Sequence, residues 1–120
     1  MKNILYIISR APYSGFQSFE LIDSAMVSAI FDHKVSILFR AEGVWGLLSN
    51  QEGELINSKT HSKVLSALPT YEIDNLYFCE DSVNERQINR DQIDIPVKPL
   101  SLSEQQQLIA NQDIVMAGPK

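Results

Sequence analysis

Cysteine is almost absent from this sequence, with Cys79 the single example among 120 residues. One cysteine cannot form an internal disulfide, and no Cys-x-x-Cys pair or Cys/His cluster is present to hold zinc. We therefore expect no bound metal and a protein of the reducing cytoplasm. The composition, 44% hydrophobic and 21% charged, is that of an ordinary globular protein. The length predicts one domain spanning residues 1–120.

Long hydrophobic runs are also absent. The apolar run Ile4–Ile8 is only five residues long and is followed at once by Ser9 and Arg10. It is too short for a transmembrane helix or for the core of a signal peptide. We interpret it as a buried strand and expect no association with a membrane.

Positive charge is scarce, since 10 basic residues stand against 15 acidic ones, giving a net charge of −5. The basic residues are scattered along the chain. A protein that binds nucleic acid directly needs a positive stripe to neutralise phosphates. The sequence therefore argues against direct contact with RNA or DNA, even if the protein acts in an RNA pathway.

A glycine-rich phosphate loop is missing as well. Residues 9–15 (Ser-Arg-Ala-Pro-Tyr-Ser-Gly) follow the first apolar run, but they lack the glycine spacing of nucleotide-binding loops. A connecting loop and no cofactor are predicted, with a flavodoxin-like FMN loop as the weaker alternative. His33 and His61 have no metal-ligand partner at helical spacing and are expected to be solvated.

What the sequence does contain is an alternation of strand and helix patterns. Apolar runs predict strands at 4–8, 35–39, 76–78, 93–97 and 113–117. Helices are predicted after Ser14 or Ser18 as far as residue 30, over one or two turns at 44–48, and at 58–68, 82–87 and 101–111. Ser101 and Glu104 form a capping-box pattern. This alternation predicts an α/β three-layer sandwich with a mainly parallel five-stranded sheet.

Cys79 follows the third predicted strand and precedes a predicted helix, at the sheet edge where such folds gather functional groups. The helix dipole and free N–H groups there favour a reactive thiolate. The acidic neighbours Glu80 and Asp81 oppose it, and no basic residue or histidine lies within four positions of Cys79. Arg10 or Arg40 could approach in the fold. A catalytic thiol and a packed thiol both remain open.

The second candidate site is a predicted subunit contact. It comprises the segment Glu42–Leu48, where apolar side chains exceed what a short helix needs for its own anchoring. Packing of the same side chains in the core is the alternative. The residues proposed for the contact are Glu42, Val44, Trp45, Leu47 and Leu48.

Several segments together resemble the DsrE/DsrF-like superfamily, in particular its DsrF/TusC branch. The most specific is Phe39–Leu48, which resembles the family pattern Phe-x-x-Asp-Gly-Val-x-x-Leu-Leu. The others are the first strand with residues 9–15, residues 20–25, Phe31-Asp32, Cys79, Arg86, and the last helix and strand. The resemblance spans the whole chain in order. Two departures are Glu42 in place of aspartate and a C-terminal segment without the family's aromatic residues.

This resemblance implies a cytoplasmic subunit of a heterohexameric sulfur-relay complex, together with TusB/DsrH-like and TusD/DsrE-like subunits. In the Tus branch, persulfide sulfur passes through small carrier proteins toward 2-thiouridine at the tRNA wobble position. The Dsr branch serves dissimilatory sulfur oxidation. In both branches the persulfide cysteine belongs chiefly to the DsrE/TusD-type subunit.

Two hypotheses follow for this chain. In the first, it is an auxiliary subunit that builds the complex and leaves the chemistry to a relative. In the second, Cys79 is itself catalytic and carries persulfide, which would make the chain a sulfurtransferase. Of the two pathways, tRNA thiolation is the expected one, since sulfur oxidation requires the rarer presence of a dissimilatory sulfite reductase.

Overall fold

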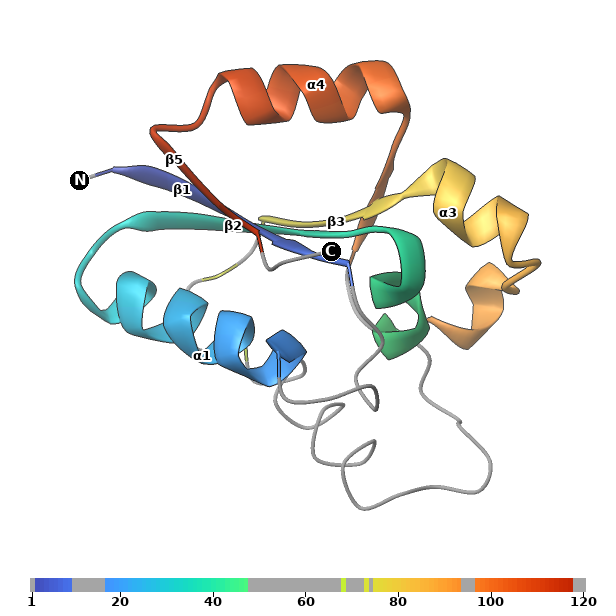
Figure 1. Cartoon of the computed structure of the whole chain (residues 1–120), viewed down its shortest axis with the longest axis horizontal. Helices are drawn as coiled ribbons and strands as arrows, with labels where there is room; N and C mark the ends of the chain where they lie inside the picture. Colours follow the sequence, from blue (N-terminus) through green and yellow to red (C-terminus); the bar gives the residue numbers. More distant parts are fainter. Residues whose placement is uncertain are drawn as a thin grey trace.

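Figure 1 shows the computed structural model of the chain, which describes residues 2–9, 17–47, 68, 73, 75–93 and 97–117. Within these residues, five strands form one parallel sheet in the order β4-β3-β2-β1-β5. The strands are β1 (Asn3–Ile8), β2 (Lys34–Phe39), β3 (Asn75–Cys79), β4 (Lys98–Leu100) and β5 (Ile114–Ala117). The predicted fold class is confirmed, with an order of strands that the sequence did not predict.

Two longer helices lie on opposite faces of the sheet (Figure 1), α1 (Gln17–Ile30) on one and α4 (Leu102–Ala110) on the other. Shorter elements follow β2 and β3: the 3₁₀ helix η1 (Ala41–Leu47), α3 (Glu80–Glu85) and the 3₁₀ turn η3 (Arg90–Gln92). The order of the strands explains why α1 and α4 cover opposite faces of the sheet. The chain steps from β1 to β2 in one direction and from β4 to β5 in the other, so right-handed crossovers place α1 and α4 on opposite sides.

The interior is divided by the sheet because successive strand residues point to opposite faces. On the α1 face, side chains from the strands pack with residues of α1, η1 and α3, including Ile22, Val44 and Val83. On the α4 face, a smaller cluster forms from Leu5, Ile7 and Leu38, with Tyr77, Leu100, Leu108 and Ile109 against it. The continuous apolar runs of β1 and β2 follow from this, since both strands are covered on both sides.

The fourth strand is a correction to the sequence prediction, which placed it at 93–97. The strand that pairs with β3 is Lys98–Leu100, with Tyr77 opposite Lys98 and Cys79 opposite Leu100. Ile93 and Val97 instead pack against the α1-face core. Ile93 and Val97 are apolar because of this packing. The sequence prediction took their apolar character as a sign of a strand and therefore placed the fourth strand several residues too early.

Other boundaries lie close to the prediction. The third strand extends to Cys79, and α3 begins at Glu80 rather than Ser82 because Cys79 is its N-cap residue. The Ser101/Glu104 capping box is confirmed, with both of its hydrogen bonds present. The predicted helix 58–68 lies outside the described residues except for Leu68, which is buried. Of the loop 9–15, only Ser9 is described.

Candidate functional site

The carboxyl ends of β1 and β2 are joined to η1 by a close backbone contact. The Arg40 N–H donates to the Ile8 carbonyl at 3.0 Å. A Cβ atom added to Gly43 would lie 2.0 Å from the same carbonyl oxygen. Only glycine allows η1 to approach the strand this closely. This explains Gly43 in the Glu42–Leu48 segment and fixes η1 at the carboxyl ends of β1 and β2.

Ser82 joins η1 to α3. Its Oγ accepts a hydrogen bond from the Ala41 N–H at 2.9 Å, and its side chain is buried. Ala41 has a φ of 52°, a left-handed conformation that turns the chain from β2 into η1. Because a serine hydroxyl can donate while it accepts, Ser82 remains able to donate a hydrogen bond to a third group.

That third group is the Cys79 thiol, at the N-cap of α3. Burial raises the pKa of Cys79, but the side chains of Ser82 and Gln105 and the N–H groups of Ser82 and Asp81 act as donors near the sulfur and outweigh burial, so the pKa is lowered overall. The N–H groups have this effect without a side-chain capping hydrogen bond between the thiol and α3. The donors around the sulfur therefore favour a thiolate.

Gln105 reaches this sulfur from α4, on the opposite face from η1. Its side chain is only 3% exposed, and its Nε2 donates to the Leu100 carbonyl at 3.2 Å. Leu100 lies directly opposite Cys79 in the β3–β4 pair. The amide thus binds the backbone of β4 and also lowers the pKa of the thiol on β3, since an NH₂ group has two hydrogens to donate.

Access to Cys79 is narrow, because the residue is 4% exposed. The acidic neighbour Glu80 lies 3.8 Å from the Arg90 guanidinium, which partly balances its charge. Arg40 is described but forms no ion pair among the described residues, and Arg10 lies outside them. Among the described residues, the groups that lower the pKa of Cys79 are neutral donors and not Arg40.

A second cluster forms around the Glu42 carboxylate, on the outer side of η1. Arg86 donates to Glu42 from Nη2 at 3.0 Å, and the Trp45 indole N–H donates at 2.7 Å. These hydrogen bonds, with the charge of Arg86, lower the pKa of Glu42. Arg86 also donates from Nη1 to the Ser82 carbonyl at 3.2 Å. The cluster locks η1 against α3.

The predicted contact segment divides into buried and surface residues. Val44 and Leu47 are fully buried in the α1-face core, where they anchor η1. Glu42 is exposed and Trp45 is half-buried, whereas Leu48 lies outside the described residues. Of the described residues in this segment, Glu42 and Trp45 are the ones available for a partner contact, because Val44 and Leu47 point inward.

The structure brings the two predicted sites together, since Ser82 touches Cys79 on one side and η1 on the other. Sequence reasoning missed Ser82 and Gln105. A signal for Gln105 was present, because Leu108 and Ile109 lie three and four positions later and place it on the buried face of α4. Ser82 was included in the predicted helix, and its position three residues after Cys79 was the available signal.

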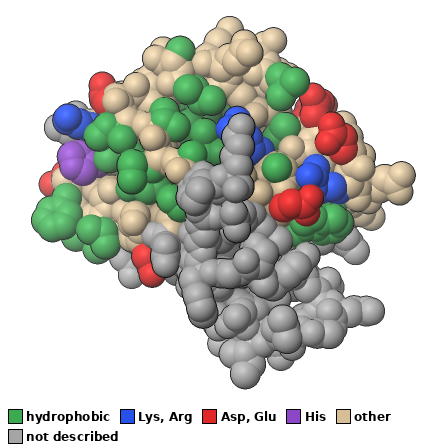
Figure 2. Space-filling model, in the orientation of Figure 1, with side chains coloured by type: hydrophobic (Ala, Val, Ile, Leu, Met, Phe, Trp, Pro, Cys, Tyr) green, Lys and Arg blue, Asp and Glu red, His purple; other side chains and the backbone are tan. Residues whose placement is uncertain are grey.

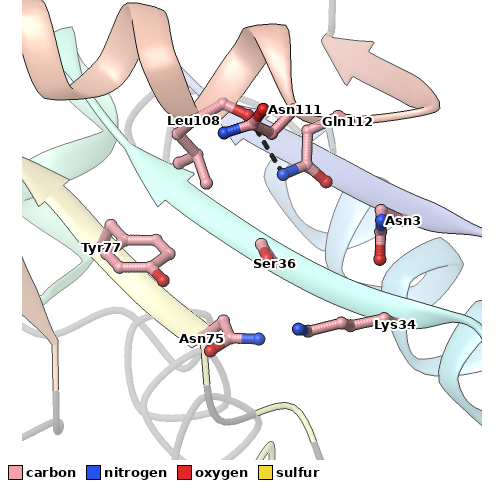
Figure 3. A pocket seen from close by; sticks show the side chains of 8 residues that line it. All are labelled: Asn3, Lys34, Ser36, Asn75, Tyr77, Leu108, Asn111 and Gln112. Carbon is pink, nitrogen blue, oxygen red and sulfur yellow. Dashed lines mark hydrogen bonds between the residues drawn. The ribbon is translucent and has the colours of Figure 1, made fainter.

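A small cavity lies at the opposite edge of the sheet, near the first residues of β1, β2 and β3 (Figure 3). Its volume is about 190 Å³, and its lining is Asn3, Lys34, Ser36, Asn75, Tyr77, Leu108, Asn111 and Gln112. Ligand pockets are usually larger and mainly apolar, about 300–1,000 Å³. Its polar side chains suit water, so the cavity is not a candidate active site.

Within the part of the chain that the structure describes, no three His, Cys, Asp or Glu side chains are grouped so that they could hold a metal ion. His33 accepts a hydrogen bond from the Lys2 N–H at its Nδ1, at 3.2 Å, and His61 lies outside the described residues. Among the described helices, none combines the length and the apolar character needed to span a membrane.

Comparison with known proteins gives a consistent picture. The sequence profile of the DsrE/DsrF-like family matches residues 2–117. The intracellular sulfur oxidation protein DsrF of Allochromatium vinosum is 29% identical over 93 residues, covering 78% of this chain and 68% of the relative. A TusC homolog of Vibrio vulnificus is 23% identical over 111 residues, covering 92% of this chain and 94% of the relative. The ychN protein of E. coli has the same fold, with a TM-score of 0.78, 19% identity and coverage of 98% and 100%.

Proposed function

Because the chain belongs to the DsrE/DsrF-like family, we propose that it is a subunit of a cytoplasmic sulfur-relay complex. The observation that carries this proposal is similarity to proteins named DsrF, over 78% of the chain, and TusC homolog, over 92% of the chain. The TusC homolog covers more of this chain than DsrF does. DsrF is the more identical of the two, at 29% against 23%. We propose thiolation of the tRNA wobble uridine as the pathway served, because sulfur oxidation would also require a dissimilatory sulfite reductase.

The role proposed for this subunit is mainly auxiliary. A thiol that is 4% exposed is poorly placed to meet a carrier protein. By contrast, the Glu42–Arg86–Trp45 cluster holds η1 in one conformation at the surface. A rigid segment with a partly exposed tryptophan is a favourable centre for a protein contact. The proposed partners are TusB/DsrH-like and TusD/DsrE-like subunits in a heterohexamer, with the catalytic cysteine on the latter.

Co-expression tests this assembly. The chain is produced with the two relatives encoded in its own genome, and the size of the purified complex is measured by light scattering. Trp45→Ala is expected to reduce incorporation of the chain at least tenfold, because the aromatic contact is lost. Leu102→Ala, on the exposed start of α4, is the matched control and should enter the complex normally. A wild-type chain that never joins its relatives would overturn the proposal.

The pathway is tested separately in cells. Deletion of this chain's gene is expected to reduce 2-thiouridine in digested tRNA several-fold, measured by mass spectrometry, and wild-type but not Trp45→Ala protein should restore it. Unchanged 2-thiouridine in the deletion strain would rule out tRNA thiolation and leave sulfur oxidation as the pathway to examine.

A second function, sulfur transfer by Cys79 itself, is favoured by the donors around its sulfur and its lowered pKa. In this reaction the Cys79 thiolate attacks the outer sulfur of a donor protein's persulfide. The new Cys79 S–S bond forms while the donor's S–S bond breaks, and the electron pair leaves with the donor's thiolate. The proton of the persulfide stays on the transferred sulfur, so no external oxidant or reductant is needed.

Intact-mass measurement decides between the two roles. Wild-type protein is incubated with a cysteine desulfurase and cysteine, first alone and then with the small carrier proteins. A gain of one sulfur that is absent in Cys79→Ser would establish Cys79 as a carrier. An unchanged mass under both conditions would leave only the auxiliary role.

A further inference from the structure

The small cavity beneath the end of α4 has the lining of a binding site, although it is too small for a usual active site. It lies between the amino ends of β1, β2 and β3 on one side and the C-terminal end of α4 on the other (Figure 3). Of its eight described lining residues, Leu108 alone is aliphatic. The lining is thus almost wholly polar, and it is contributed by four elements that lie far apart in the sequence.

The α4 face of the sheet changes from apolar to polar at this cavity. Toward the carboxyl ends of the strands, Leu5, Ile7 and Leu38 form the apolar cluster on this face. Because strand residues two positions apart share a face, the residues that precede the cluster point the same way. Those residues are polar in all three strands: Asn3 on β1, Lys34 and Ser36 on β2, and Asn75 on β3.

These polar side chains do not satisfy one another. Ser36 is only 5% exposed, and within the described part of the chain no hydrogen bond or ion pair occupies the side chains of Lys34, Ser36 or Asn75. Figure 3 shows the ends of Lys34 and Asn75 directed toward each other on the sheet side of the cavity. Buried polar groups normally have hydrogen-bond partners. Molecules inside the cavity therefore have to supply them.

Gln112 gives the most specific indication of a ligand. Its Nε2 donates a hydrogen bond to the Leu108 carbonyl at 3.1 Å, which fixes the orientation of the amide. The Oε1 atom of the same amide is buried and accepts no hydrogen bond from any described residue. A buried acceptor without a partner is costly. The occupant of the cavity must therefore carry a group that donates to this oxygen.

The charges around the cavity oppose a charged ligand of either sign. Lys34, the one charged residue in the described lining, repels a cation. The C-terminal end of α4 is the negative end of the helix dipole and contributes Asn111 and Gln112 to the lining, so it disfavours an anion. Figure 2 shows basic, acidic and histidine side chains together at the end of the molecule where β1 begins. No single sign of charge prevails there, and a neutral ligand is favoured.

We propose that this cavity binds a small neutral polyol of about four or five carbon atoms. Hydroxyl groups both donate and accept, so one polyol can donate to Gln112 Oε1 and accept from Lys34 and Asn75. A volume of about 190 Å³ holds about six water molecules at roughly 30 Å³ each. A polyol of this size displaces such waters while reproducing their hydrogen bonds. The site lies at the opposite edge of the sheet from Cys79 and stands apart from the sulfur-relay proposal.

Titration of the full chain with erythritol, a four-carbon polyol, tests the site. In NMR spectra the backbone amides of Ser36, Asn75 and Gln112 should shift and then saturate. The dissociation constant is expected in the millimolar range, because a ligand of so few atoms makes few contacts. Shifts that grow linearly without saturation, or that spread evenly over the whole chain, would indicate a solvent effect and overturn the proposal.

Variants test the residues that carry the argument. Gln112→Leu removes the buried acceptor and should weaken erythritol binding at least tenfold. Gln106→Leu makes the same change at an exposed position of α4 outside the cavity and should bind as wild type does. Because Gln112→Leu also removes the bond to the Leu108 carbonyl, Ser36→Val is a second variant that alters only the sheet side of the cavity, and it should weaken binding several-fold. Circular dichroism checks that each variant is folded.

Wild-type affinity in a folded Gln112→Leu or Ser36→Val variant would overturn the proposal. Inorganic phosphate and tetramethylammonium probe the charge of the ligand, and neither should bind as tightly as erythritol. Tighter binding of either ion would overturn the assignment to a neutral polyol. Absence of saturable binding by all three would leave the cavity to water and equally overturn it. None of these outcomes changes the sulfur-relay proposal, which co-expression tests independently.

Discussion

Gln105 is a polar side chain inside an otherwise apolar layer, and its amide is shared between a backbone carbonyl and a thiol. A buried amide without partners is costly, so both of its donor hydrogens matter to the fold. The contact with Cys79 gives the residue a second consequence, because it helps to lower the pKa of the thiol. The polarity of this position is therefore explained by chemistry as well as by stability.

Replacing Gln105 by leucine is expected to raise the pKa of Cys79, because one donor to the thiolate is lost while burial remains. The pH dependence of iodoacetamide alkylation measures this pKa, with the midpoint moving upward in the variant. Gln106→Leu, at the exposed neighbouring position, should leave the midpoint unchanged. Equal midpoints in wild type and Gln105→Leu would show that Gln105 only packs beside the sulfur.

The lowered pKa of Cys79 also predicts how stability changes with pH. A free thiol ionises near pH 8.5, and the folded thiol ionises below its ordinary value. The ionised sulfur thus contributes stability that is fully present above the unfolded pKa and is lost as pH falls through the folded pKa. The difference in free energy of unfolding between wild type and Cys79→Ala should grow as pH rises through this window.

Urea denaturation at half-unit steps from pH 6 to 9.5 measures that difference. Because the two proteins differ only at residue 79, the titration of other groups cancels to a first approximation. A difference that is flat over the whole range would contradict a perturbed thiol.

At the scale of elements, α4 is held by its first turn. The Glu104 N–H donates to the Ser101 hydroxyl at 3.2 Å, and the Ser101 N–H donates to the Glu104 carboxylate at 2.9 Å. Four of its nine residues carry long polar side chains, and few of its side chains are buried. The two capping hydrogen bonds therefore contribute a large share of the stability of α4, and so help to hold Gln105 in place.

Ser101→Ala is expected to lower the free energy of unfolding by about 1 kcal/mol, within a range of about 0.5–2 kcal/mol for lost caps. For a chain of this length the melting temperature should fall by roughly 3–6 °C. Ser103→Ala removes the same hydroxyl at an exposed position inside the first turn, and should change the melting temperature by less than half as much. Equal losses in the two variants would rule out a specific capping effect.

For the whole molecule, burial predicts the order in which backbone amides exchange with solvent. Strands β1 and β2 are buried along almost their full length, whereas β4 and β5 form the edges. Amides of the two central strands are expected to exchange slowest, because they open only when the sheet unfolds.

The sequence predicted the fold at the level of class, because the alternation of apolar runs with amphipathic helices depends on local periodicity. It also placed Cys79 correctly at the start of a helix. The sequence prediction failed where contacts between distant parts of the chain determine the structure. Ile93 and Val97 have the composition of a strand but pack beneath the sheet, and the strand order depends on crossovers that no local pattern encodes.

The candidate site was predicted only in part, for a related reason. The Glu42–Leu48 segment was recognised, but Val44 and Leu47 proved to be its anchors. The side chains that act as donors to the thiol come from residues 3 and 26 positions away along the chain. Ser82 is local, whereas Gln105 reaches the sulfur because α4 crosses the far face of the sheet.

The pairing of β1 with β5 has a kinetic consequence. Asn3 and Asp113, which join the starts of the two strands, are 110 positions apart. Closing so long a loop carries a large entropic cost, which is recovered only after the intervening chain is ordered. The sheet should therefore assemble from β1 and β2 outward, with β5 added in a late step of refolding. Until then one side of β1 lacks a neighbour, and a slow final phase is the period in which the chain is most prone to aggregate.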